Sequence, residues 1–343
     1  MYSINSHSGF QPLKEVWLGD CYPESYYDHY DSREKDFFSF ITESTKSDLN
    51  KFQNKLQELG ITVRRPQFES IEKYLDEDGN LCKPPITPRD WALTLGSTLY
   101  VMPQYKNSFT SFESTIQEYR TQNLNIQVLD RSAPDPMCYV PFPSVVRLGK
   151  DIYLDKKQDS DGYTHFLKQA ELLANDYRVH ITHTGDHSDG VFCPVAPKNI
   201  FSTHYRLLYN DTFPDWDVFF LNDTTKYRKG NGHNAKWWVP GCHYAIFNED
   251  IVRRAHHWIG NSQETVFEVN MLVVDDKNIF CIAEDDLACK KLESMGFTVH
   301  VIDFKTRGFW DGGLHCLTVD ICREGPCVDY WPDRGSNGLY YYK

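Results

Sequence analysis

Apolar residues recur along this chain in short, strand-length runs that alternate with segments of helical spacing. Near the N-terminus, the runs EVWLGD and ITVRR flank a stretch in which Leu49, Phe52, Leu56 and Leu59 are spaced for one face of a helix near Ser47–Leu59. Further strand-length runs and helical segments alternate in the same way toward the C-terminus. The pattern predicts an α/β protein with strands and helices in regular succession.

Similar pairs of segments indicate that the chain repeats one structural unit. The segment KLQELGITV resembles KLESMGFTV, and both are typical of a helix end, a glycine stop and a β-branched strand. KNIF occurs twice, and GKDIYL and GSTLYV share a turn followed by a strand. These segments lie at 55–63, 291–299, 198–201, 277–280, 149–154 and 96–101. The predicted unit is strand, tight turn, strand, helix, strand.

Five copies of this unit can be followed along the chain. Their helices are predicted near 47–59, 112–121, 164–175 and 285–295, and the helix of the fourth copy is weakly signalled. Because one copy cannot bury its own apolar face, we expect the units to surround an axis, with strand ends and loops meeting at the centre. The alternative is an open α/β sheet. We expect a single domain over 1–343, with an irregular, lid-like insertion near 212–263.

Composition narrows the possible partners and the cellular compartment. Of the 343 residues, 41% are hydrophobic, which suits a folded protein, and the net charge of −12 disfavours nucleic acid and anionic membranes as partners. The start of the sequence lacks a signal-peptide layout and no apolar run approaches membrane-spanning length. We therefore expect a cytoplasmic protein whose ten cysteines are reduced thiols.

The segment GGLHC, residues 312–316, holds the first candidate for chemistry. Two glycines ahead of Cys316 allow close backbone approach or unusual dihedral angles. A nucleophilic cysteine must be accessible and have its thiolate stabilised, and a nearby histidine can do this and later move protons. The alternative is a cysteine that only fills apolar space.

Two further segments carry candidate carboxylates. In HTGDHSDGVF, His187 and Asp189 lie two residues apart, so in an extended strand both side chains would face one pocket as proton shuttle and cation anchor. In TPRDWALTLG, Asp90 directly precedes an apolar strand. The alternatives are ordinary loop chemistry for the first pair and a capping role for Asp90.

Metal and nucleotide sites are not expected. Cys316, Cys322 and Cys327 lack the paired short spacings of a zinc site, and no glycine-rich phosphate loop follows a strand. The sequence thus predicts no metal and no cofactor.

The three motifs PRD, HSD and GGLHC, in this order, resemble the amidinotransferase family. That family includes glycine and inosamine-phosphate amidinotransferases, within the guanidine-modifying (pentein) superfamily that also holds arginine deiminases. The resemblance runs from EVWLGD to CREG, nearly the full chain. It implies a five-unit pseudo-symmetric α/β propeller, the pentein fold, around a central active site, in agreement with the repeats.

The resemblance also implies roles for individual residues. Cys316 matches the nucleophile that attacks the guanidinium carbon of L-arginine, and His187 matches the general acid/base. Asp90 and Asp189 match the carboxylates that hold the guanidinium nitrogens, a geometry that suits its planar donors. Arg206 keeps the family's spacing from HSD and matches the partner of the donor's carboxylate.

Two positions depart from the family's pattern. Ser144 stands where the family usually has an aspartate beside the catalytic histidine, and a serine cannot stabilise an imidazolium as a carboxylate does. Glu268 stands where glycine amidinotransferase has a small hydroxyl residue near the substrate. A carboxylate at that position suits a ligand that bears an amine.

These motifs predict an enzyme that moves an amidino group from L-arginine to an amine acceptor, such as glycine or a related amine, through a cysteine-bound intermediate, and releases ornithine. A hydrolase that uses the same cysteine is the alternative, and a protein that only binds a guanidino ligand is a third hypothesis, motivated by Ser144. The expected partners are small-molecule substrates, without nucleic acid or membrane, and a homodimer is compatible with this prediction.

Overall fold

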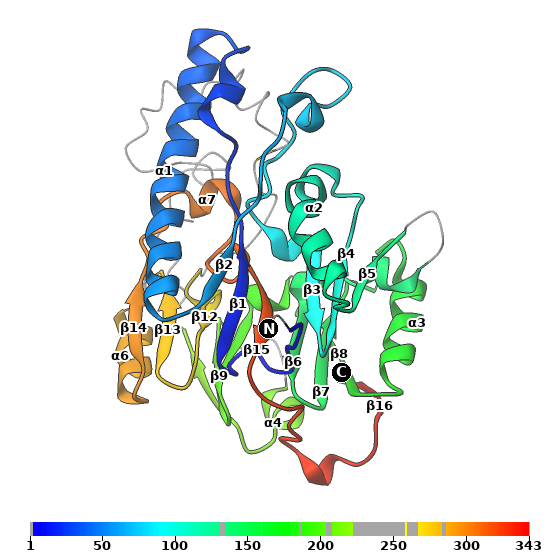
Figure 1. Ribbon diagram of the computed structural model, residues 1–343. Coiled ribbons are helices and arrows are strands. Elements are labelled where there is room, and N and C mark those ends of the chain that lie inside the picture. Colours follow the sequence, from blue (N-terminus) through cyan, green and yellow to red (C-terminus); the bar gives the residue numbers. More distant parts are fainter. Residues whose placement is uncertain are drawn as a thin grey trace.

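The computed structural model describes residues 3–130, 135–158, 160–184, 187–203, 208–221, 258, 267–282 and 286–342. Within them the strands form five small sheets, drawn in Figure 1. In each sheet the first strand is antiparallel to the second, and the second is parallel to the third. No sheet closes on itself within the described residues.

In the order first, second and third strand, the first sheet holds β15 (Thr318–Arg323), β1 (Leu13–Leu18) and β2 (Thr62–Arg64), and the second sheet holds β3 (Ala92–Leu95), β4 (Thr98–Val101) and β5 (Ile126–Val128). The third sheet holds β6 (Val145–Leu148), β7 (Asp151–Asp155) and β8 (Arg178–Thr182), and the fourth holds β9 (Phe192–Ala196), β10 (Asn199–Ser202) and β11 (Asp217–Phe220). The fifth sheet holds β12 (Leu272–Val273), β13 (Asn278–Cys281) and β14 (Thr298–Val301). A further strand, β16 (Gly338–Tyr341), pairs with β8.

A helix connects the second and third strands of each sheet, as parallel neighbours require. These helices are α1 (Ser32–Glu58), α2 (Lys106–Thr121), α3 (Tyr163–Leu173), α4 (Tyr209–Thr212) and α6 (Asp286–Ser294); α7 (Arg307–Trp310) precedes β15. None of the helices within the described ranges is both long enough and apolar enough to cross a membrane.

The predicted repeat of strand, turn, strand, helix and strand is confirmed. Both KNIF segments fall on second strands, β10 and β13, and both helix-glycine-strand segments end a helix at a glycine of positive φ, Gly60 at 79° and Gly296 at 95°. The weakly signalled fourth helix is the single turn α4. The predicted boundaries differ most for α1, which begins at Ser32 because Asp31 caps it by accepting a hydrogen bond from the amide of Glu34.

The first sheet takes its first strand from the other end of the chain. β15 pairs antiparallel with β1, with Trp17 opposite Val319. The segment that carries Cys316 therefore leads into an edge strand that pairs with the N-terminal strand β1. The repeats do not predict this pairing, because it joins residues about 300 positions apart, a separation that follows from the register of Leu18 opposite Thr318.

Short 3₁₀ turns lead into the first strands of four sheets. They are η3 (Pro88–Asp90), η5 (Phe142–Ser144), η6 (Ser188–Gly190) and η9 (Phe267–Val269), and the segment 312–316 leads into β15 in the same way. Five candidate residues lie on these turns, so the repeat positions them at equivalent places in each unit: Asp90, Ser144, Asp189, Glu268 and Cys316.

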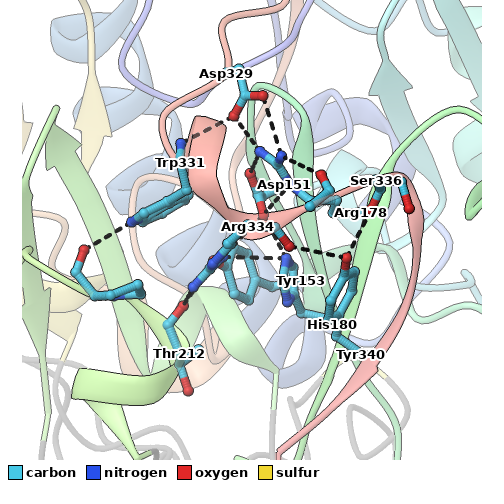
Figure 2. A network of polar contacts seen from close by, with 12 residues as sticks. Asp151, Tyr153, Arg178, His180, Thr212, Asp329, Trp331, Arg334, Ser336 and Tyr340 are labelled. Carbon is cyan, nitrogen blue, oxygen red and sulfur yellow. Dashed lines mark hydrogen bonds and ion pairs between the residues drawn. The ribbon is translucent and has the colours of Figure 1, made fainter.

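The C-terminal segment 329–342 contacts the third sheet through a network of hydrogen bonds and ion pairs (Figure 2). The buried carboxylate of Asp151 accepts hydrogen bonds from Arg178 at 2.7 Å, from His180 at 2.6 Å and from Arg334 at 3.0 Å. Arg178 also pairs with Asp329, and His180 bonds the hydroxyl of Tyr342 at 2.7 Å. We call this group of residues the C-terminal network.

The C-terminal network should make the protein less stable on acidification. Burial lowers the pKa of His180 despite its bond to Asp151. Burial alone would raise the pKa of Asp151, but the hydrogen bonds from His180 and Arg178 lower it. Because the pKa of His180 lies below its unfolded value of 6.5, the stability that it contributes is full above that pH and falls as pH drops through it, by up to about 1.4 kcal/mol per pH unit. The contribution of Asp151 is lost only below its own unfolded pKa of 3.8.

Thermal unfolding between pH 7.5 and 5.5 tests this expectation. His180→Asn should lower the Tm at pH 7.5 and make its decline with acidification shallower than in the unmodified protein. His29→Asn, at an exposed position outside the network, is the matched control. An identical pH dependence in all three proteins would show that His180 does not couple protonation to stability.

Candidate active site

Cys316 lies at the end of the turn that enters β15, and its thiol is buried, with 3% of the residue exposed. Its amide donates to Oδ1 of Asn270 at 2.9 Å, and Nδ2 of Asn270 donates to Sγ at 3.1 Å. The same Nδ2 also donates to the carbonyl of Asp189 at 3.2 Å. One amide side chain thus fixes both the backbone and the sulfur of Cys316.

The two glycines before Cys316 are required by close packing. A Cβ on Gly313 would lie 2.5 Å from Cβ of Asn270, and a Cβ on Gly312 would lie 3.0 Å from Cβ of Cys316. Neither glycine has a positive φ. Of the two reasons considered from the sequence, close backbone approach is therefore correct and unusual dihedral angles are wrong.

Asp189 is the carboxylate that contacts the thiol. Its Oδ2 lies 3.5 Å from Sγ of Cys316 and 2.8 Å from Nδ1 of His315. Its Oδ1 is buried and makes no hydrogen bond to any described residue. A small cavity of about 40 Å³ adjoins Asp189 and His315.

Charge at Asp189 is maintained by its surroundings. Burial alone would raise the pKa of this carboxyl group, but the hydrogen bond from His315 and the charges of His315, His187 and Arg89 lower it. Burial and the charge of Arg89 lower the pKa of His315. We infer that Asp189 is ionised, which suits the site to attract a cation.

His187 immediately precedes η6, the turn that carries Asp189. The expectation that both residues share an extended strand is wrong, because Asp189 belongs to a 3₁₀ turn and only His187 has extended backbone angles. The two side chains are nevertheless close enough for the charge of His187 to act on Asp189. The histidine is half-buried.

Asp90 is the last residue of η3. Its carboxylate accepts a hydrogen bond from the hydroxyl of Thr87 at 2.6 Å. Cγ2 of Thr87 lies 3.6 Å from the position that a Cβ of Gly312 would occupy, so η3 packs against the turn. Asp90, Thr87 and Trp91 line a cleft of about 520 Å³. The carboxylate therefore borders a space that a small molecule can enter.

Ser144 and Glu268 occupy the corresponding turns η5 and η9, and both are buried, at 3% and 1% exposed. η5 contacts η3 and η6, and η9 contacts η6. Ser144 therefore lies beside the turn of Asp189, and Glu268 lies two residues before Asn270.

The five turns contact one another in a cycle. η3 contacts η5, η5 contacts η6, and η6 contacts η9. The amide of His315 donates to the carbonyl of Asn270, and Nε of Arg89 donates to the carbonyl of His315, which joins η9 to the 312–316 turn and that turn to η3. Candidate residues from distant parts of the chain are thereby gathered at one place.

Two predictions lie wholly or mostly outside the described residues. Arg206 is not described, nor is most of the stretch 212–263. Within that stretch, Trp258 is fully buried, and its indole N–H donates to the carbonyl of Leu81 at 2.8 Å.

The sequence analysis did not identify the buried polar residues that hold the site in place. Asp320 is buried and accepts hydrogen bonds from Arg89 at 2.7 Å, Arg147 at 2.5 Å and Arg323 at 2.8 Å. Burial would raise its pKa, but the three guanidinium groups hold it well below its usual range. The only sequence signal was an arginine in each of PRD, VVRLG and CREG. Asn270 and the hydrogen bond of His315 left no signal that a single sequence reveals.

No group of three or more histidine, cysteine, aspartate or glutamate side chains is placed to hold a metal ion in the part of the chain that the structure describes. The fold and the site together define an α/β protein with a buried thiol in contact with a buried carboxylate, and with a cleft beside Asp90.

The relatives of the chain are amidinotransferases. L-arginine:L-lysine amidinotransferase of Pseudomonas savastanoi pv. phaseolicola is 25% identical over 189 residues, 54% of this chain and 44% of that protein. The chain thus spans less than half of that relative's length. Inosamine-phosphate amidinotransferase 1 of Streptomyces glaucescens is 22% identical over 379 aligned positions, 96% of this chain and 99% of that protein. No model of a protein family matches the sequence.

Solved structures show the same fold. SxtG, an amidinotransferase of the saxitoxin biosynthetic pathway from Microseira wollei, has a TM-score of 0.68 at 18% identity, over 95% of this chain and 99% of its own. Inosamine-phosphate amidinotransferase StrB1 of Streptomyces griseus has a TM-score of 0.67 at 18% identity, over 96% and 99%. The predicted resemblance to amidinotransferases is confirmed, and the prediction of an enzyme agrees with these relatives, all of which are enzymes.

Proposed function

We propose that the protein transfers an amidino group from L-arginine to an amine acceptor and releases L-ornithine. The carrying observation is the contact of 3.5 Å between Oδ2 of Asp189 and the buried thiol of Cys316. Support comes from the similarity of the chain to amidinotransferases over nearly its whole length.

The donor's guanidinium group is held between Asp90 and Asp189 in this proposal. Oδ1 of Asp189 is buried without a hydrogen-bond partner among the described residues, and a guanidinium N–H would supply one. Asp90 lines a separate cleft beside η3, the turn that packs against the Cys316 turn. Arg206 would pair with the carboxylate of arginine, as its spacing from HSD implies.

The reaction proceeds in two halves. The thiolate of Cys316 attacks the guanidinium carbon, and the bond from that carbon to the side-chain nitrogen of ornithine breaks as His187 donates a proton to the leaving amine. This leaves an amidino thioether on Cys316. In the second half, His187 takes a proton from the acceptor amine, which attacks the same carbon, and the C–S bond breaks to regenerate the thiolate.

Asn270 and His315 support this chemistry without reacting. The hydrogen bond from Nδ2 of Asn270 to Sγ stabilises the thiolate, and His315 keeps Asp189 in place. Ser144 puts a hydroxyl group in η5, where the family's pattern has a carboxylate. Glu268 is the acid that suits an amine-bearing ligand.

The arrangement of the whole chain is also part of the proposal. The cycle of contacts among the five turns supports a closed five-unit propeller around the site, formed by one domain over 1–343. The lid-like insertion predicted near 212–263 would then begin after residue 221, because Asp217–Phe220 forms β11 of the fourth sheet. The protein would act in the cytoplasm.

Incubation with L-arginine, with and without a panel of amines, tests the proposal. With an acceptor amine in excess of the enzyme, we expect ornithine together with a new guanidino compound, and without an acceptor we expect no new guanidino compound. Citrulline as the product would show that the protein hydrolyses arginine with the same cysteine instead of transferring the amidino group. Arginine binding without any product would show a protein that only binds guanidino ligands.

A further inference from the structure

Four buried charged groups meet at β15. Oδ1 of Asp320 accepts a hydrogen bond from Nη2 of Arg89 at 2.7 Å. Oδ2 of the same carboxylate accepts hydrogen bonds from Arg147 at 2.5 Å and from Arg323 at 2.8 Å. None of the four side chains is more than 3% exposed. Because arginine stays protonated in proteins, three positive charges surround one negative charge, and this arginine cluster has a net charge of +2.

The other hydrogen bonds of the three arginines go to neutral groups. Nε of Arg89 donates to the carbonyl of His315 at 2.9 Å, and Nη1 of Arg147 and Nη1 of Arg323 each donate to a main-chain carbonyl group at 2.5 Å. In the part of the chain that the structure describes, no carboxylate other than Asp320 forms an ion pair with them. The excess positive charge is therefore not neutralised within the cluster, and burial keeps water from screening it.

The arginine cluster lies beside the turn that carries Cys316. The hydrogen bond from Arg89 reaches the carbonyl of His315, the residue that directly precedes Cys316. Arg147 lines the same small cavity of about 40 Å³ as Asp189 and His315. The cluster therefore borders both groups that flank the thiol, one along the chain and one in space.

Both of these groups respond to the positive charge. Burial and the charge of Arg89 lower the pKa of His315, although its bond to Asp189 opposes the change. Burial alone would raise the pKa of Asp189, but the hydrogen bond from His315 lowers it, and the charge of Arg89 adds to the lowering. Oδ2 of Asp189 lies 3.5 Å from Sγ of Cys316. The cluster thus favours negative charge close to the place where a thiolate forms.

Carboxyl groups on the turns around Cys316 act in the opposite direction. Asp189 contacts the thiol, Glu268 is buried on η9, and Asp90 lies on η3. A negative charge next to a thiol disfavours the thiolate, so these acids alone would shift ionisation of Cys316 to higher pH. The other titratable groups near the thiol are His187, His315 and Cys193 of β9, a thiol whose pKa burial raises to about 12.

We propose that the excess positive charge of the arginine cluster promotes ionisation of the Cys316 thiol and thereby offsets the carboxylates that hold the substrate cation. The three arginines are positioning residues, because they act through the electrostatic potential at Sγ and not as an acid or a base. The site can then bind a guanidinium group between carboxylates and still present a thiolate to it. This inference rests on the proposed function only for the role of Cys316 as nucleophile.

The pH dependence of alkylation tests the inference without any substrate. The rate at which iodoacetamide modifies Cys316 is followed against pH by peptide mass spectrometry, because the thiolate is the reactive form. The difference in thiolate absorbance between each protein and its Cys316→Ala counterpart gives the same midpoint without a reagent.

Arg147 is the residue to change, because it bonds Asp320 and makes no hydrogen bond to the 312–316 turn within the described chain. Arg147→Met should raise the midpoint for Cys316 by about one pH unit or more, since a nearby opposite charge shifts a pKa by about 1–3 units. Arg147→Lys keeps the charge and loses the planar fork, so it should lower the Tm and leave the midpoint unchanged. Arg33→Met, at an exposed position on α1, should change neither value.

Asp320→Asn gives a test of opposite sign. It removes the one negative charge of the cluster, so the midpoint for Cys316 should fall by about one pH unit. Combining Arg147→Met with Asp320→Asn removes one charge of each sign and restores the net charge of the cluster. The midpoint of the double variant should therefore return to that of the unmodified protein, although two buried residues are changed.

A shift in Arg147→Lys as large as that in Arg147→Met would overturn the inference, because it would show an effect of geometry and not of charge. Shifts of the same sign in Arg147→Met and Asp320→Asn, or equal midpoints in all variants, would overturn it as well. Should Arg147→Met fail to fold, the fall expected in Asp320→Asn decides alone. Cys289, a half-buried thiol on α6, is the internal reference and should keep its own midpoint throughout.

Formation of the amidino adduct separates this inference from the proposed function. In each variant, the pH dependence of adduct formation with L-arginine should move together with the alkylation midpoint of Cys316. No adduct in the unmodified protein would contradict the proposed function, and the alkylation midpoints would still decide whether the cluster promotes ionisation of the thiol. An adduct whose pH dependence is the same in Arg147→Met as in the unmodified protein would overturn the inference alone.

Discussion

Replacing Cys316 by alanine should abolish turnover with L-arginine and leave the fold intact. The substitution removes the nucleophile, but the amide of residue 316 still donates to Oδ1 of Asn270, and Nδ2 of Asn270 still donates to the carbonyl of Asp189. Cys316→Ser should be nearly as inactive, because an alkoxide is much harder to form than a thiolate. Intact-protein mass spectrometry after mixing with arginine should detect an amidino adduct only in proteins that keep Cys316.

The matched control for this experiment is Cys327→Ala, since Cys327 is a half-buried thiol in the C-terminal part of the chain. It should keep both turnover and the adduct. An adduct that persists in Cys316→Ala, or that maps to Cys322 or Cys327, would falsify the assignment of the nucleophile.

Asp189→Asn should reduce kcat/KM for arginine by more than about 10- to 100-fold. That factor corresponds to the loss of one charged hydrogen bond of about 1.5–3 kcal/mol. The substitution removes two charged interactions, one with the bound cation and one with His315, so the loss should exceed it. The pKa of His315 should fall further, because the raising effect of Asp189 disappears. Steady-state kinetics and NMR titration of His315 measure the two effects.

Asp217→Asn provides the comparison, because it makes the same change at an exposed position on β11 and should keep wild-type kinetics. If Asp189→Asn retains wild-type kinetics as well, this carboxylate does not hold the guanidinium group. A normal KM with a strongly reduced kcat would instead indicate that Asp189 acts on the thiol of Cys316 rather than on substrate binding.

Much of the fold could be predicted because the repeats are local. A helix that ends at a left-handed glycine and is followed by a strand depends on neighbouring residues, and Gly60 and Gly296 both carry this signal. The helix boundaries were predicted less accurately, because they also depend on contacts with residues far away in the sequence. The cap at Asp31 sets where α1 begins, and its first turns also bury Phe37 and Phe38 against Phe309 and Trp258, which lie far away in the sequence.

The candidate site was predictable in part. Cys316, Asp189 and Asp90 stand in short motifs, and the structure places Cys316 and Asp189 in contact, with Asp90 on the neighbouring turn. Their roles in the reaction stay predictions until the variants are measured. The geometry expected for His187 and Asp189 was wrong, because two residues that alternate in a strand are arranged differently in a 3₁₀ turn.

The sequence by itself determined the units, their turns and the motifs, since hydrophobic spacing and glycine positions act over a few residues. The tertiary structure decided what surrounds them. Asn270 bridges Cys316 and Asp189, three arginines converge on Asp320, and β15 completes the first sheet. These contacts join residues many positions apart, and their geometry exists only once the units have packed together.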